Sequence, residues 1–470
     1  MEKAETRPTG LLALLFVSYT SLSLARRALQ DVYPLIPGSL SDEYSATRLG
    51  TILSFQTAGY TATKLISGVL MDHINPTKTF LATLLCTAIT LFLMSISSNP
   101  LFWLILCTIN GLALGMSWPS VAKILRTSVP PRELATWWGI ISAAVNLAGG
   151  LGPWIALSLF TVLSISFGEQ RAWKFVLIMT GSGCVLSVLL LILHSSSRPG
   201  RDGRKMICTH DAGSSSGSTC LSNGLIQVVG DPQHTEKNDI KTGGSNELGL
   251  LRQWRKLTLS LSTTQRMLLC CSATVHLGST FLRFAISNWF PIMLLRQKEE
   301  FGYSRGSVNS LISFYELGGI LGNIFAGILS DVSVGRRQSW LNPRIPFILT
   351  QMGLASVVLV TVSFLVNTGV VRMWALLSMA FILGLTVFGT VSLCGVLAVE
   401  LVPPSLSGTC HALTALAANV GAFLACSPMT WLSSQIGWPG TFMCSGMLGL
   451  LSVIPLCAIS SMRRLRASSE

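Results

Sequence analysis

The chain has 470 residues, of which 50% are hydrophobic and only 11% are charged, and its mean hydropathy is +0.58. A water-soluble domain needs about 25% charged residues to cover its surface. The composition therefore excludes a soluble monomer and predicts a protein embedded in a lipid bilayer.

The basic residues, which give a net charge of +13, lie in alternate loops and not on one aromatic-rich face, so we expect no nucleic-acid partner. This distribution follows the positive-inside rule and predicts that both termini and the central linker are cytoplasmic. The mixed-charge loop near Arg296–Arg305 is expected outside. The basic clusters are Lys123–Arg132, Arg198–Lys205, Arg252–Lys256, Arg336–Arg344 and Arg463–Arg466.

Twelve apolar segments have the length of about 20 residues that crosses a hydrocarbon core of roughly 30 Å. Inside lipid such segments must be helical, because their backbone groups have no water to bond. We therefore expect an all-α polytopic membrane protein. The predicted helices are 9–36, 47–71, 77–97, 100–124, 134–163, 172–194, 264–295, 306–330, 344–366, 371–398, 406–431 and 437–460.

The region 196–262 differs from the rest because it is rich in Ser, Gly, Asp, Lys and Asn and lacks apolar periodicity. Such composition predicts a largely disordered cytoplasmic linker. We therefore divide the chain into a six-helix bundle (1–195), this linker (196–262), a second six-helix bundle (263–462) and a cytoplasmic tail (463–470).

Internal repeats indicate how the two bundles are related. The segment Gly68–Asp72 (GVLMD) recurs as Gly327–Asp331 (GILSD), 259 residues later, and Asn146 recurs as Asn419, 273 residues later, with Pro130 and Thr136 at the same offset from Pro403 and Thr409. Two six-helix halves in parallel repeat are the architecture of the major facilitator superfamily.

Three cations within the apolar segments are candidate site residues, because a cation at the bilayer centre costs about 2.5 kcal/mol or more. Arg26 and Arg283 occupy matching places in the two halves, and Lys64 lies eight residues before Asp72, too deep for its ammonium to reach the interface. Arg26 could instead mark a helix end, and Lys64 could instead form an internal ion pair with Asp31 or Glu316. Arg27 points elsewhere on the helix, and we assign it no role in the site.

Four further residues complete the candidate site: Tyr19, two turns before Arg26 on the same face, the amides Asn146 and Asn419, and Glu316. The two amides could equally bond across helices as structural contacts, and Glu316 could balance a cation or carry a proton. Three cations with few acids favour an anionic substrate, since the arginine fork suits phosphate oxygens. We find no catalytic nucleophile–base set, cofactor motif or metal-ligand spacing, and so expect no enzyme, cofactor or metal.

Several segments resemble the organophosphate:phosphate antiporters, with the glucose-6-phosphate translocase branch as the nearest pattern. They are Ser67–Asp72, Asn110–Pro119, Trp137–Pro153, Tyr315–Gly319, Gly408–His411 and Asn419–Gly421. The resemblance covers all twelve helices and implies that phosphate-binding cations of helices 1, 7 and 2 fall on Arg26, Arg283 and Lys64. The translocase branch has Lys where this chain has Arg283, and the family's Tyr near Arg26 is replaced by Ser23.

The resemblance implies antiport of a phosphorylated sugar or glycerol phosphate, glucose 6-phosphate being the first expectation, against inorganic phosphate. It implies an endoplasmic reticulum membrane, with plastid and plasma membranes as alternatives. We expect a monomer whose partners are the bilayer and the small anion. Two other functions remain open: a facilitator for another organic anion, and a sugar-phosphate sensor that signals without transport.

Overall fold

The computed structural model describes residues 9–37, 45–129, 134–196, 261–296, 303–334, 342–369, 372–402 and 407–467, and all regular elements in these ranges are helices. The expected all-α membrane fold is confirmed. Residues 197–260 of the predicted linker, the tip of the mixed-charge loop and the last residues of the tail lie outside the described residues.

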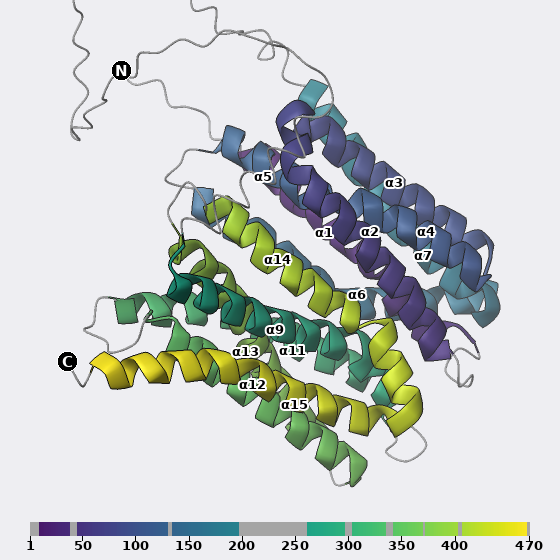
Figure 1. Ribbon diagram of the computed structural model, residues 1–470. Coiled ribbons are helices and arrows are strands. Elements are labelled where there is room, and N and C mark those ends of the chain that lie inside the picture. Colours follow the sequence, from purple (N-terminus) through teal and green to yellow (C-terminus); the bar gives the residue numbers. More distant parts are fainter. Residues whose placement is uncertain are drawn as a thin grey trace, which may run out of the picture.

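The helices form two groups, one from each half of the chain, which lie side by side (Figure 1). The first group consists of α1 (Thr9–Val32) with the short 3-10 helix η1 (Tyr33–Leu35), α2 (Ser45–His73), α3 (Pro76–Ile96), α4 (Pro100–Leu114), α5 (Ser117–Ser128), α6 (Leu134–Phe167) and α7 (Glu169–Ser196). The second consists of α9 (Thr263–Arg296), α11 (Arg305–Val334), α12 (Ile345–Asn367), α13 (Met373–Glu400), α14 (Ser407–Leu424) and α15 (Ser427–Ala467).

All twelve predicted segments are helical, and two of them differ in detail. The fourth segment is broken into α4 and α5, and the eleventh runs through α14 into the start of α15. The chain then reverses within α15 at Gly437, whose φ of 74° is outside the helical range and is readily adopted only by glycine. The last segment begins there.

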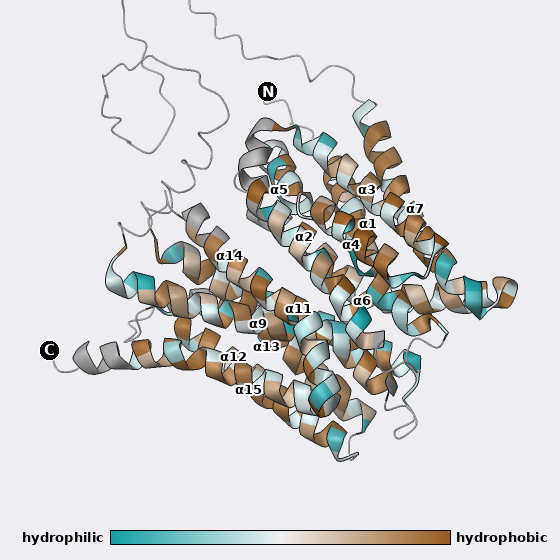
Figure 2. Ribbon diagram, turned by 45° about the vertical axis from the view of Figure 1, so that its right-hand side comes forward, coloured by the Kyte–Doolittle hydropathy of each residue, from teal (hydrophilic) through white to brown (hydrophobic). Residues whose placement is uncertain are grey.

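Ten stretches of the described residues are long and apolar enough to cross a membrane. The stretch Leu413–Ser461 spans 49 residues and contains the reversal at Gly437, so it supplies two crossings. Helix α2 is not among the ten, and its 29 residues are long enough to span despite its polar side chains. The described helices therefore supply twelve crossings. Large apolar side chains such as those of Ile165 and Leu193 are exposed, and hydrophobic residues run along the helices of both bundles (Figure 2).

The two halves repeat each other in contacts as well as in sequence. Gly111 of α4 packs directly against the backbone carbonyl of Gln56 in α2, and Gly384 of α13 packs in the same way against the carbonyl of Tyr315 in α11. The glycines are 273 residues apart and their partners 259 apart, which are the offsets of the sequence repeat. A side chain at either glycine would force the helices apart, so glycine sets the close approach of the backbones.

Candidate functional site

Two of the predicted cations share one aromatic ring in the first bundle. The guanidinium carbon of Arg26 lies 4.5 Å from the ring centroid of Tyr60, and Nζ of Lys64 lies 5.1 Å from the same centroid. Arg26 belongs to α1 and Lys64 to α2, and each lies at least six residues inside the ends of its helix. Cation–π contacts of this kind stabilise a cation that has left bulk water, so the Tyr60 ring supports both side chains.

The second bundle holds Arg283 in the same way. Its guanidinium carbon lies 4.4 Å from the ring centroid of Phe388 on α13 and 5.7 Å from that of Phe284. The Tyr315 hydroxyl donates a hydrogen bond of 3.4 Å to the Arg283 carbonyl oxygen, which fixes α11 against α9 at this level.

The aromatic rings that support the two arginines come from helices that are not equivalent in the two halves. Tyr60 belongs to α2, and the residue 259 positions later is Gly319 of α11. Phe388 belongs to α13, and the residue 273 positions earlier is Gly115 of α4. Gly319 packs against the Phe388 ring, and Gly115 packs against the backbone of Tyr60. Each half therefore supplies one aromatic support and one glycine that makes room for it.

The two arginines face a common region. Arg283 interacts electrostatically with Arg26, and Tyr19 interacts with both. The Tyr19 ring lies 5.4 Å from that of Trp118 at an interplanar angle of 49°. The structure thus brings together four of the predicted residues: Arg26, Lys64, Arg283 and Tyr19.

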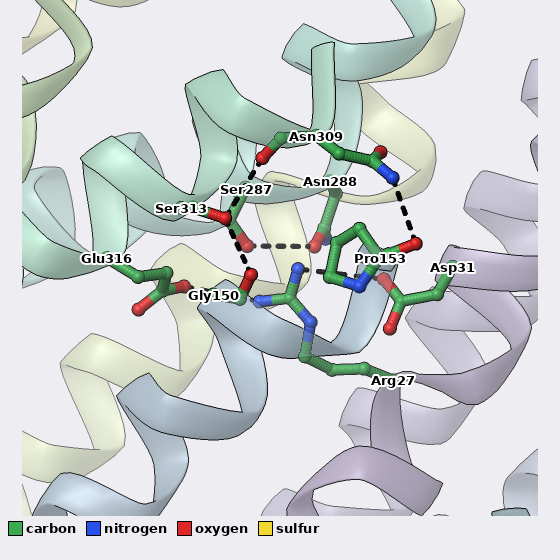
Figure 3. Close-up of polar contacts among 9 residues, drawn as sticks. All are labelled: Arg27, Asp31, Gly150, Pro153, Ser287, Asn288, Asn309, Ser313 and Glu316. Atoms are coloured by element: carbon green, nitrogen blue, oxygen red, sulfur yellow. Dashed lines mark hydrogen bonds and ion pairs between the residues drawn. The ribbon is translucent and has the colours of Figure 1, made fainter. Parts of the chain in front are cut away.

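Glu316 joins the two bundles through Arg27. Oε1 of Glu316 accepts a hydrogen bond of 3.2 Å from Nη1 of Arg27, and Nη2 of Arg27 lies 3.9 Å from the Asp31 carboxylate (Figure 3). Glu316 is only 4% exposed. A buried carboxylate is costly unless it is paired, so this contact favours keeping α1 and α11 together.

Helix α6 packs tightly around this ion pair. Gly149 lies against the Glu316 carboxyl group and Gly152 lies against that of Asp31, with 2.5 Å and 2.6 Å from an added Cβ to the nearest oxygens. A small cavity of ≈ 40 Å³ continues outward from Arg27. Since a water needs about 10–15 Å³, it has room for about three waters.

Further contacts between the bundles lie toward the end where α1 and α9 finish, which we call the outer end. Trp154 donates a hydrogen bond to Ser313, and Ser313 donates one to the Gly150 carbonyl. Near the start of α2, the Ser54 hydroxyl accepts a hydrogen bond from the Ser427 amide of α15. These hydrogen bonds lie from the level of Arg27 outward, so this conformation is closed at its outer end.

The two predicted amides, Asn146 and Asn419, lie on α6 and α14. Asn146 is 6% exposed and lies one helical turn before Gly149, so it is on the face of α6 that meets α11. Asn419 is half-buried on α14. Their roles stay predictions.

The sequence analysis missed several residues that the structure places at or beside the cations. We gave Arg27 no role, and it makes the ion pair that joins the bundles. The alternative in which Lys64 pairs with Asp31 or Glu316 is not seen, because Arg27 contacts both acids.

The aromatic neighbours of the cations differ in how far the sequence could reveal them. Tyr60 could have been found, since it lies four residues before Lys64 on the same helical face. Phe388 and Trp118 carry no local signal, because their neighbours come from distant helices.

Comparisons with known proteins agree with this arrangement. The family model described as the Major Facilitator Superfamily matches residues 11–426 and 268–469. A probable hexose phosphate transport protein of Chlamydia pneumoniae is 24% identical over 433 residues, covering 91% of this chain and 86% of that protein. The glycerol-3-phosphate transporter of Bacillus subtilis is 24% identical over 436 residues, with the same two coverages.

Among solved structures, a bacterial homologue of the human lysosomal transporter Spinster, in an inward-facing and unoccupied conformation, superposes with a TM-score of 0.63. It is 13% identical, and the match covers 98% of this chain and 97% of that one. This likeness concerns the fold alone.

The paired bundles, the repeat of their contacts and the family match lead to one conclusion: the chain is a multi-pass membrane protein of the Major Facilitator Superfamily, a transporter family and not an enzyme family, with distant relatives among the organophosphate transporters.

Proposed function

We propose that this protein exchanges an organic phosphate for inorganic phosphate across a membrane by alternating access, with glucose 6-phosphate as the first candidate substrate. One observation supports the proposal most: Arg26 and Arg283, one from each bundle, each rest on an aromatic ring, and both interact electrostatically with Tyr19. The relatives named as hexose phosphate and glycerol-3-phosphate transporters fit this chemistry.

The charge balance of the site favours a multivalent anion. Four cations (Arg26, Arg27, Lys64 and Arg283) lie at this level with two acids (Asp31 and Glu316), and both acids are engaged by Arg27. That leaves an excess of two positive charges. A phosphate dianion would neutralise them, whereas a single carboxylate would leave one cation unpaired.

The same excess charge gives a reason for exchange. Without an anion, closing the inner end over Arg26, Lys64 and Arg283 would bring like charges together in a medium of low dielectric, which is unfavourable. A bound phosphate group removes that repulsion and accepts charge-assisted hydrogen bonds from both arginines. The bundles would therefore rock between their two closed ends readily only when loaded, and each crossing would carry an anion.

The two sides of the site differ, which bears on how a sugar phosphate would lie. The first bundle offers two cations, and the hydroxyl of Tyr60 faces both of them. The second offers one cation on the apolar ring of Phe388. We place the phosphoryl group between the arginines on the Lys64 side, with the sugar toward Tyr19 and Trp118, an aromatic pair that can cover a sugar ring.

Reconstituted counterflow tests the proposal. Proteoliposomes loaded with labelled phosphate should release label rapidly when phosphate or hexose 6-phosphate is added outside, and slowly when the outside contains a matched concentration of acetate. Triose and glycerol phosphates in the same assay rank the substrates. Release that is equally fast into acetate would indicate a facilitator of general anions, and specific binding without release would indicate a sensor.

We further propose that the protein resides in the endoplasmic reticulum membrane with both termini in the cytoplasm, so that the closed outer end faces the lumen. The alternating basic loops support this orientation. A protease-protection assay on microsomes, with tags at each terminus, should show both tags digested without detergent.

A further inference from the structure

A crevice within the first bundle is separate from the phosphate site and opens toward the lipid. It lies between α1, α6 and α7, and its volume is ≈ 180 Å³. An apolar cavity of about 150 Å³ is large enough to admit benzene. The crevice is therefore large enough for an apolar guest, and its mouth carries Ile155 and Met179, which are 40% and 52% exposed.

The crevice is elongated along the helices. Each of its three walls is a stripe of residues at helical spacing, with Ser21, Leu24, Ala28 and Val32 on α1, Gly152, Ile155, Ala156 and Leu159 on α6, and Val176, Met179, Thr180 and Gly183 on α7. The distance from Ser21 to Asp31 along α1 is about 15 Å at 1.5 Å per residue. That is half of a hydrocarbon core of roughly 30 Å, or one leaflet.

The size of the wall residues explains why the space exists. More than a third of them are glycine, alanine or serine, and an added Cβ at Gly183 would meet no atom within 4 Å. Tight packing elsewhere in the bundle is different: Gly181, two residues earlier on the same helix, lies against the Phe92 ring. The space beside Gly183 is thus local to the crevice.

One ionisable group lies at the end of this largely apolar groove. Asp31 lines the crevice, and it also lines the small cavity beside Arg27. The carboxylate therefore forms part of the wall between a lipid-facing groove and the ion pair that closes the outer end.

We propose that this crevice binds one acyl chain of a phospholipid from the outer-end leaflet, with its headgroup near Asp31. The length of about one leaflet, the largely apolar walls and the exposure of Ile155 and Met179 at the mouth fit a hydrocarbon chain better than a soluble polar ligand. A chain seated there packs against α1 and α6 on either side of Asp31, and so supports the helices that hold Arg27.

The test uses the full chain in liposomes containing a phospholipid with a photoactivatable group midway along its acyl chain. Irradiation followed by peptide mass spectrometry should place adducts on Met179, Thr180 and Ile155 at several times the yield of exposed apolar residues far from the crevice, such as Leu354 on α12. Gly183→Leu fills the space and should lower the crevice adducts at least fivefold.

Gly353→Leu is the matched control, because Gly353 is also a helical glycine whose added Cβ meets nothing within 4 Å, but it lies on α12 in the other bundle. Its crevice adducts should equal those of the unmodified protein. Thr180→Leu is a second filling variant in case Gly183→Leu does not fold. Adducts spread evenly over all lipid-facing residues, or unchanged in both filling variants, would overturn the proposal. The adduct yields do not depend on transport, so this experiment tests the lipid-binding proposal independently of the proposed exchange.

Discussion

At the scale of single residues, the proposed function depends most on the two arginines in the apolar helices. Arg26 and Arg283 hold equivalent positions, and each rests on a ring supplied by another helix of its own bundle. The sequence could identify these two cations, since an arginine in an apolar segment is expensive. It could not identify the rings, because Phe388 lies 105 residues beyond Arg283 along the chain.

The first prediction concerns the arginine fork. Arg283→Ala should lower phosphate exchange about 10- to 150-fold, because a hydrogen bond to a charged group contributes about 1.5–3 kcal/mol. Arg283→Lys keeps the charge but loses the bidentate geometry, so its loss should be smaller. Initial exchange rates in proteoliposomes measure both. Arg171→Ala, at an exposed arginine, is the control, and equal rates for Arg283→Ala and that control would contradict the role given to Arg283.

The second prediction separates the ring of Tyr60 from its hydroxyl. Tyr60→Phe keeps the support under Arg26 and Lys64 and should reduce exchange only a few-fold. Tyr60→Leu removes the cation–π contact, worth about 0.5–2 kcal/mol, and should reduce exchange further. Phosphate titrations of the exchange rate would show the difference. Equal losses in the two variants would mean that the hydroxyl, and not the ring, is what matters.

At the scale of elements, glycine determines how closely the helices pack. The twelve helices could be predicted because each is long and apolar, and the repeat offsets predicted which helices are equivalent. The break between α4 and α5 could not be predicted. It follows Gly115, where α4 passes close to the backbone of Tyr60 and Lys64, and that contact exists only in the folded bundle.

The third prediction tests this packing. Gly384→Ala should lower the stability of the protein by about 1–3 kcal/mol, the usual cost of overpacking, because the new methyl group would meet the Tyr315 carbonyl. Gly353→Ala meets open space and should be neutral or slightly stabilising, since alanine favours helix. Thermal unfolding in detergent compares the two. A melting temperature of Gly384→Ala equal to that of Gly353→Ala would show that the helices do not approach so closely.

At the scale of the whole molecule, the ion pair between Arg27 and Glu316 joins the bundles at the level of the site. The sequence could not reveal it, because α1 and α11 are 289 positions apart at this contact. Arg27 points away from Arg26 on the helix, and for that reason we had assigned it no role.

The fourth prediction follows from this contact. Arg27→Gln leaves Glu316 and Asp31 buried without their cation, and breaking a buried pair costs about 3–5 kcal/mol. The closed outer end should therefore open. Spin labels at Phe167 and Ser304, both exposed at the outer end, should report a longer distance between the bundles. The control Arg171→Gln should leave the distance unchanged, and an unchanged distance in Arg27→Gln would show that other contacts suffice for closure.

The most direct test of the central claim is the binding of labelled phosphate to the purified protein and to variants lacking one or both arginines. We expect one saturable site per chain, whose affinity is severely weakened by Arg26→Ala and by Arg283→Ala alone. The double variant should lose less binding free energy than the sum of the two single losses, because both groups hold the same anion. Wild-type affinity in either single variant, or two sites lost independently, would contradict it.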